Sequence, residues 1–133
     1  MQITLSEEIS HSLPVTVFHI TGPIDAASCN ELERQARETY QNGTERLLLD
    51  LTDVNYVGSS ALGAISTIFN LLRSGTSEES DDVIRKGLQE GTFKSSLLKI
   101  VCPNDSVKQV LALSGYDKFL EIHKDLPEAL RSF

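Results

Sequence analysis

The chain has 133 residues, of which 40% are hydrophobic and 23% are charged, so its size and composition are those of one soluble globular domain. Its formal net charge of −7 argues against nucleic acid or an anionic membrane surface as the main partner. No apolar run approaches the roughly 20 residues of a membrane span, and the N-terminus lacks the basic and apolar regions of a secretory signal.

The first secondary-structure elements are two expected strands. Residues 2–5 and 15–20 are rich in Ile, Thr, Leu and Val, which favours extended backbone. The polar residues 6–12 and Pro14 between them predict a turn region. We therefore expect an antiparallel pair.

A helix is predicted next. Asp25 is a good N-cap for a helix that starts near Ala26, and Asn42 with Gly43 supplies a left-handed stop. Apolar side chains recur at helical spacing and should face the core: Cys29, Leu32, Ala36 and Tyr40.

The most informative stretch covers residues 47–72. It opens with a short apolar strand at 47–51, whose two faces should both be covered, as in the centre of a sheet that carries helices. It ends with an apolar helix at 61–72. Gly58, Ser59 and Ser60 lie between them and are here called the hinge, with Ser59 or Ser60 as the expected N-cap of the helix.

The remaining residues predict an insertion and then more alternating elements. Residues 74–96 are acidic and contain serine, glycine and little apolar periodicity, so we interpret them as an inserted excursion. A strand is expected at 97–101, then a helix capped within residues 103–106, a strand at 119–122 and a last helix capped by Asp125. The resulting order predicts an α/β domain with a largely parallel sheet preceded by a hairpin.

The hinge invites three interpretations. A nucleophile elbow needs glycine two residues on each side of the serine. Ser60 has Gly58 before it but Leu62 after it, and Ser59 meets the requirement on neither side, so an enzyme or small-ligand binder is the weakest hypothesis. A serine before an apolar helix is usually an N-cap. It is also a place where a phosphate is tolerated, because helix N-termini offer free N–H groups and a positive dipole end.

Metal or cofactor chemistry finds little support. Asp25, Asp50 and Asp53 each lie at or near a strand end and could gather at one end of the sheet, but cap and turn roles account better for Asp25 and Asp53. Cys29 and Cys102 are far apart, which fits reduced thiols in a cytoplasmic protein and gives no zinc spacing. We expect no metal, no cofactor and no catalytic residue.

Taken together, several segments resemble the STAS domain, the sulfate-transporter and anti-sigma-factor-antagonist module. The matching pieces keep the order and spacing of that family: GPIDAAS at 22–28, LLLDLTDVNYV at 47–57, SSALGAI at 59–65, and LALSGYDKFLEI at 111–122 followed by PEAL. The resemblance implies a single domain over residues 1–133, interrupted by the acidic insertion at about 74–96. It implies a four- or five-stranded mixed sheet with helices packed mainly on one side.

The resemblance also implies a function. It predicts a bacterial, cytoplasmic, non-enzymatic regulator of transcription, an anti-sigma factor antagonist. The unphosphorylated form would bind an anti-sigma factor that is also a serine kinase, and a separate serine phosphatase would reset the switch. The phosphorylated residue carries over to Ser59, with Ser60 as the alternative.

Two residues depart from the family's pattern at the hinge. Gly58 stands where the family has an Asp, and Ala61 stands where it has a Gly. A STAS module that only scaffolds, for instance in a transporter or signalling assembly, is therefore the alternative function. The residues expected to contact the partner are Asp25, Asp53, Gly58, Ser59, Ser60, Ala61 and Leu62.

Overall fold

The structure of the chain, a computed structural model, describes residues 1–74 and 97–133. The predicted α/β class is confirmed: five strands form one mixed sheet, in the order β1-β2-β3-β4-β5. The strands are β1 (Gln2–Ser10), β2 (Leu13–Thr21), β3 (Leu47–Asp53), β4 (Leu98–Val101) and β5 (Glu121–His123). The helices are α1 (Ala26–Gln41), α2 (Ser59–Ser74), α4 (Asp105–Leu113), the 3₁₀ turn η1 (Tyr116–Lys118) and α5 (Leu126–Arg131).

The antiparallel hairpin of β1 and β2 is confirmed, but its strands are longer than predicted. Gln2 pairs with Thr21 and Ser10 with Leu13 in one unbroken register. The turn predicted at residues 6–12 is wrong, because only His11 and Ser12 turn, with φ angles of 51° and 67°. The polar residues before them lie in an edge strand, where half of the side chains face water and polar residues are tolerated.

The other strands run parallel to β2. Parallel pairing joins β2 to β3, β3 to β4 and β4 to β5, so the sheet continues in chain order from the hairpin. Helix α1 connects β2 to β3, as the alternation of strand and helix predicted. The expected strand at 119–122 is shifted to Glu121–His123, because Tyr116–Lys118 form a 3₁₀ turn first.

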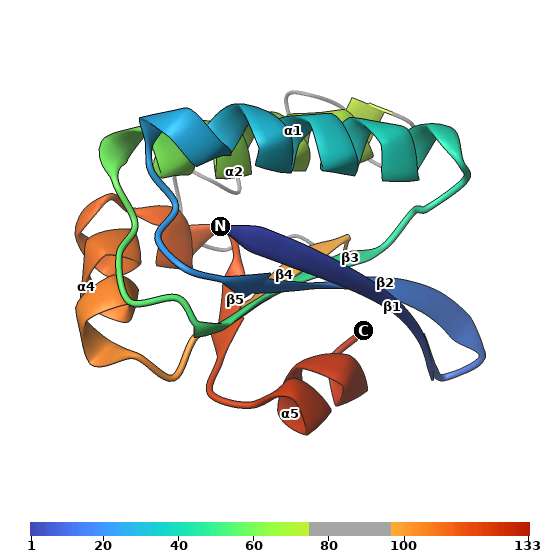
Figure 1. Cartoon of the computed structure of the whole chain (residues 1–133). Coiled ribbons are helices and arrows are strands. Elements are labelled where there is room, and N and C mark those ends of the chain that lie inside the picture. Colours follow the sequence, from blue (N-terminus) through green and yellow to red (C-terminus); the bar gives the residue numbers. More distant parts are fainter. Residues whose placement is uncertain (75–96) are drawn as a thin grey trace.

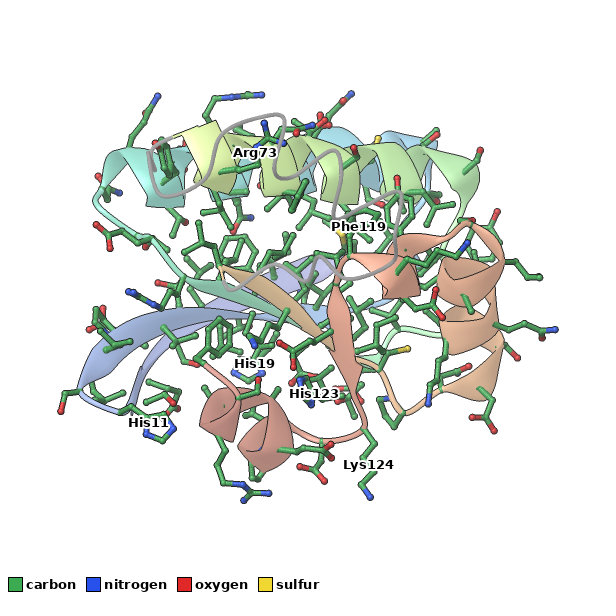
Figure 2. All side chains as sticks on the ribbon, turned by 180° about the vertical axis from the view of Figure 1, so that it is seen from behind. His11, His19, Arg73, Phe119, His123 and Lys124 are labelled. Carbon is green, nitrogen blue, oxygen red and sulfur yellow. The ribbon has the colours of Figure 1, made fainter. Side chains whose placement is uncertain are left out.

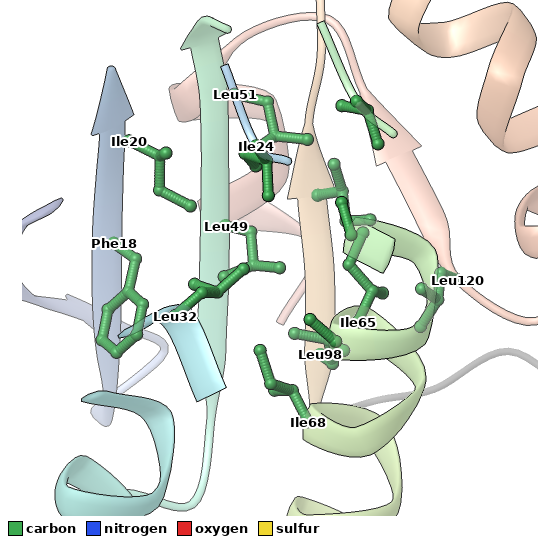
Figure 3. Close-up of a cluster of buried hydrophobic side chains, with 14 of the residues drawn as sticks. Phe18, Ile20, Ile24, Leu32, Leu49, Leu51, Ile65, Ile68, Leu98 and Leu120 are labelled. Carbon is green, nitrogen blue, oxygen red and sulfur yellow. The ribbon is translucent and has the colours of Figure 1, made fainter. Parts of the chain in front are cut away.

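Helices α1 and α2 lie side by side across one face of the sheet, and α5 lies on the opposite face (Figure 1). The main core fills the space between the sheet and the helix pair. Phe18, Leu49 and Leu98 of the sheet meet Leu32 of α1 and Ile65 of α2, all with at most 1% exposure (Figure 3). Helix α4 adds Val107 and Leu111 to the same cluster, so most helical packing is on one side, as predicted.

A smaller core lies under α5. Val17, Leu48 and Val101 of the sheet pack there against Ala129. Burial of alternate residues of β3 on both faces explains its continuous apolar run. Lys99 is 2% exposed on this face, where its ammonium contacts the Glu121 carboxylate and donates to the carbonyl oxygen of Ser132 at 3.0 Å.

The acidic insertion expected at about residues 74–96 falls, apart from Ser74, outside the described residues. Among the helices within residues 1–74 and 97–133, none is long and apolar enough to cross a membrane.

Candidate functional site

The candidate site lies where the loops that follow β2 and β3 come together. Ile24 and Val57 form an isolated parallel bridge between these loops. The amide of Ile24 donates to the carbonyl oxygen of Tyr56 at 3.0 Å, and the amide of Gly58 donates to the carbonyl oxygen of Ile24 at 3.0 Å. The bridge holds the start of α1 beside the start of α2, as the neighbouring helix ends in Figure 1 show.

Helix α2 presents two hydroxyl groups at its start. Ser59 and Ser60 are exposed, whereas Ala61 is fully buried in the core and Leu62 is half-buried. The prediction that Ser59 or Ser60 is the N-cap is wrong, because the helix already begins at Ser59. Gly58 holds the cap position, and its carbonyl oxygen accepts from the Ala61 amide at 3.0 Å.

This placement determines what the hinge can do chemically. The first N–H groups of a helix have no carbonyl one turn earlier to bind, and the helix dipole adds a partial positive charge there. Ser59 is the first residue of α2 and Ser60 the second. An anionic group carried by either hydroxyl would therefore lie in a favourable field without disturbing the core.

Tyr56 belongs to this surface, although it is not among the partner residues predicted from the sequence. Its side chain is 55% exposed and lies against Gly58: a Cβ at Gly58 would be 3.3 Å from the Tyr56 hydroxyl oxygen. Buried Val54 and Val57 anchor the loop on either side of it. The sequence signal for Tyr56 is a large aromatic residue between two apolar valines, three residues before Ser59.

Tyr116 is a second residue at this site that was not predicted from the sequence. Its hydroxyl group donates to the carbonyl oxygen of Leu62 at 2.6 Å, although 54 residues separate them. Its ring lies 5.2 Å from that of Phe119, which in turn lies 5.1 Å from Phe69 of α2. These contacts hold the first turn of α2 against η1, so the hinge serines sit on a supported surface.

Asp25 is confirmed as the N-cap of α1. Its carboxylate accepts from the amides of Ala27 and Ser28, both at 3.1 Å, and the Ser28 hydroxyl accepts from the Asp25 amide at 2.9 Å. The hydrogen bonds from Ser28 to the charged form lower the pKa of Asp25 below its ordinary value of 3.8. Asp25 remains next to Ile24, and therefore beside the hinge.

The three aspartates do not gather as one cluster. Asp50 turns to the α5 face, where a carboxylate oxygen lies 2.9 Å from Nδ1 of His19. Asp53 is exposed at the end of β3, and its carbonyl oxygen accepts from the Gly22 amide at 3.4 Å. Asp25 and Asp53 thus share the hinge end of the sheet, while Asp50 does not contribute to that surface.

The histidines also lie away from the hinge, on the α5 side (Figure 2). Nε2 of His19 lies 3.0 Å from the Ser6 hydroxyl oxygen, and Nε2 of His11 lies 3.1 Å from the carbonyl oxygen of Arg131. His123 lies between the carboxylates of Glu121 and Glu128, at 3.4 Å and 3.5 Å. None of these contacts places a general base at Ser59 or Ser60.

The cysteines are free thiols, and Cys102 is buried while Cys29 is half-buried. Burial raises the pKa of the Cys102 thiol above its ordinary value. In the part of the chain that the structure describes, no three His, Cys, Asp or Glu side chains are arranged to hold a metal ion.

Comparison with known proteins adds family information to this geometry. A family model for the STAS domain matches residues 6–78, which is more than half of the chain. No curated protein sequence matches the chain significantly.

Three solved structures share the fold at low sequence identity. A candidate anti-sigma factor antagonist from Thermotoga maritima is 20% identical with a TM-score of 0.69, over 95% of this chain and 91% of the other. An anti-sigma factor antagonist from Mycobacterium paratuberculosis is 19% identical with a TM-score of 0.67, over 97% and 92%. The antagonist SpoIIAA in its unphosphorylated form is 9% identical with a TM-score of 0.61, over 96% and 93%.

Proposed function

The chain belongs to the STAS domain family, and from this premise we propose that it is an anti-sigma factor antagonist switched by phosphorylation of Ser59. In this proposal the unphosphorylated protein binds an anti-sigma factor that is also a serine kinase, and so releases a sigma factor. The kinase phosphorylates Ser59 and ends the interaction. A serine phosphatase restores the binding form.

The observation that carries the proposal is the exposed pair Ser59 and Ser60 on the first turn of α2. A kinase needs an accessible hydroxyl, and the helix N-terminus accommodates the phosphate that results. Ser59 is preferred over Ser60 because it occupies the position of the phosphorylated residue in the STAS pattern. Ser60 is the alternative acceptor.

The proposed partner surface surrounds these hydroxyls. It consists of the predicted residues Asp25, Asp53, Gly58, Ser59, Ser60 and Leu62, to which the structure adds the exposed Tyr56. Ala61 was expected to belong to it, but a fully buried side chain contributes by positioning the first turn of α2 and not by contact.

The switch requires no refolding. A phosphoserine adds about 1.5 to 2 negative charges to a surface that already carries Asp25 and Asp53. Burying that charge against a partner costs desolvation, and nearby carboxylates of either protein repel it. A loss of roughly 3 kcal/mol weakens binding about a hundredfold.

The proposal describes a non-enzymatic signalling protein of the bacterial cytoplasm. Its chemistry is received from the kinase and removed by the phosphatase, and its own role is protein–protein interaction in the regulation of transcription. The proposed unit is one STAS domain over residues 1–133 with an insertion at about 74–96.

A STAS scaffold without a phosphorylation cycle, for instance in a transporter-associated assembly, is the second candidate. Gly58 is the observation that favours it, because the STAS pattern has an Asp beside the acceptor serine and this chain does not. The loss of that carboxylate changes the local charge that a kinase would recognise.

Intact mass after incubation with the cognate anti-sigma factor kinase and ATP separates the two candidates. We expect the wild type and Ser60→Ala to gain one phosphate and Ser59→Ala to gain none. A gain that persists in Ser59→Ala and disappears in Ser60→Ala would move the switch to Ser60. Binding of the kinase with no mass gain in any variant would favour the scaffold.

A further inference from the structure

The two edge strands of the sheet differ in length. On one side β5 is only three residues long, so it offers little backbone for pairing. On the other side β1 has nine residues, and its register with β2 continues from Gln2 to Ser10 without a bulge. No described strand pairs with the outer side of β1, which runs along the open edge in Figure 1.

The sequence of β1 protects this edge only with the charges of Glu7 and Glu8. Soluble proteins usually blunt a long edge strand with charged side chains, above all lysine, or with proline or a bulge. The β1 sequence QITLSEEIS contains neither lysine nor proline. Instead it exposes two large apolar side chains on the helix side of the sheet, Leu5 at 46% and Ile9 at 66%. A nine-residue strand with an open backbone and exposed apolar residues is a typical site for pairing with another strand.

We propose that the occupant of this edge is β1 of a second copy of the chain, paired antiparallel about a two-fold axis at Ser6. This inference does not depend on the proposed function, since neither Ser59 nor its partner takes part. The pairing joins two sheets into one continuous sheet, an isologous interface in which the same strand serves both copies.

The sequence of β1 is self-complementary in this register. With Ser6 on the axis, Ile3 lies opposite Ile9 of the partner copy on the helix side, so the most exposed apolar residue of β1 gains an apolar neighbour. Leu5 lies opposite Glu7, and Thr4 lies opposite Glu8 on the other side of the sheet. No carboxylate lies directly opposite another.

The two neighbouring registers that keep the same side chains on the helix side of the sheet are less suitable. Moving the axis to Glu7 places that carboxylate opposite its own copy, and like charges directly across a strand pair are destabilising. Moving the axis to Leu5 places Ile3 opposite Glu7 and leaves Ile9 beyond the paired segment. The remaining repulsion among the glutamates of the two strands is screened by salt, so the dimer should tighten as the salt concentration rises.

Sedimentation of the full chain over a range of concentrations measures whether the dimer forms. Substitutions at Leu5 test its register. Leu5→Glu places a carboxylate opposite Glu7 of the partner copy, once in each half of the interface. We expect it to raise the dissociation constant about tenfold or more. Leu5→Lys removes the same apolar side chain but creates two opposite-charge pairs, so it should keep the dimer. Leu113→Glu, at an 81% exposed site on α4, is the control for surface charge.

Disulfide trapping tests the axis directly, in a Cys29→Ser background. Residues directly opposite in an antiparallel pair have Cα atoms about 4.5–5.5 Å apart, within the range of a disulfide. Ser6→Cys should therefore form a cross-linked dimer on oxidation. Two copies of Thr4→Cys would lie four residues apart along the strands, about 13 Å, and should not.

A chain that stays monomeric at every concentration and salt level overturns the proposal. So does a dimer in which Leu5→Glu and Leu5→Lys behave alike, or one in which Thr4→Cys cross-links as readily as Ser6→Cys. Circular dichroism of each variant establishes that the monomer is folded before its association is compared.

Discussion

Gly58 is the residue at which this chain departs most clearly from the STAS pattern, and replacing it with aspartate gives a prediction with a definite sign. Gly58 occupies the cap position of α2 and is not among the glycines with positive φ, so a side chain meets no backbone strain there. The new Cβ would lie 3.3 Å from the Tyr56 hydroxyl oxygen and 3.7 Å from the carbonyl oxygen of Ile24. Tyr56 is 55% exposed, so its ring can turn away into solvent.

The size of the stability change expected for Gly58→Asp follows from the energetics of helix capping. Aspartate is better than glycine at an N-cap by a few tenths of a kcal/mol, and a negative charge at a helix N-terminus adds about 0.3–1 kcal/mol. After the small cost of moving Tyr56, we expect Gly58→Asp to stabilise the chain by about 0.5–1 kcal/mol at pH 7. For a domain of this size, that raises Tm by about 2–4 °C. The gain should be lost in acid, as the pH falls through the lowered pKa of the new carboxylate.

Urea unfolding of a matched set of variants tests this reasoning. Gly58→Ala adds the same Cβ without an acceptor oxygen, so it should destabilise by about 0.5–1 kcal/mol. Tyr56→Ala removes the contact between Tyr56 and residue 58. Measured relative to Tyr56→Ala alone, the double variant Tyr56→Ala, Gly58→Asp should therefore show the full stability gain of the aspartate cap. If Gly58→Asp destabilises the chain as much as Gly58→Ala does, the Tyr56 contact outweighs the cap and our account of this position is wrong.

Three further predictions concern the surroundings of the hinge. Tyr116→Phe removes the hydrogen bond to the Leu62 carbonyl oxygen and should lower the free energy of unfolding by about 1 kcal/mol in a denaturant titration, with Phe119 packing retained. Because the pKa of Asp25 is lowered, its contribution to stability is present above the ordinary pKa of 3.8 and is lost as the pH falls below it. Asp25→Asn should therefore flatten the acid side of a plot of unfolding free energy against pH. An unchanged acid side would contradict the capping role of Asp25. Native alkylation followed by peptide mass mapping should modify Cys29 well before buried Cys102, whose pKa is raised, and equal rates would contradict the burial of Cys102 in the main core.

Much of the fold could be predicted because the signals are local. The run at residues 47–51 is apolar except for Asp50, which favours a strand covered on both sides. The caps Asp25, Asn104 and Asp125 bind amides two or three residues away, so their roles are visible in the sequence. These elements were identified close to their observed positions.

What could not be predicted depends on contacts between distant segments. The polar half of β1 has the composition of a turn, and nothing within that half shows that Glu7 pairs with Thr16 and Glu8 with Val15. The support of α2 by Tyr116 joins residues 54 apart, and the hydrogen bonds that bring Gly58 to Ile24 cross between two loops. Local sequence pattern carries no information on such pairs, so the sequence predicts the hinge but not the residues that support it.

The central claim is that a phosphate on Ser59 turns off binding to an anti-sigma factor kinase. Calorimetry with the kinase from the same cell, titrated with unphosphorylated chain and with chain phosphorylated only at Ser59, measures it directly. We predict an affinity about a hundredfold weaker for the phosphorylated form. Equal affinities for the two forms would contradict the account.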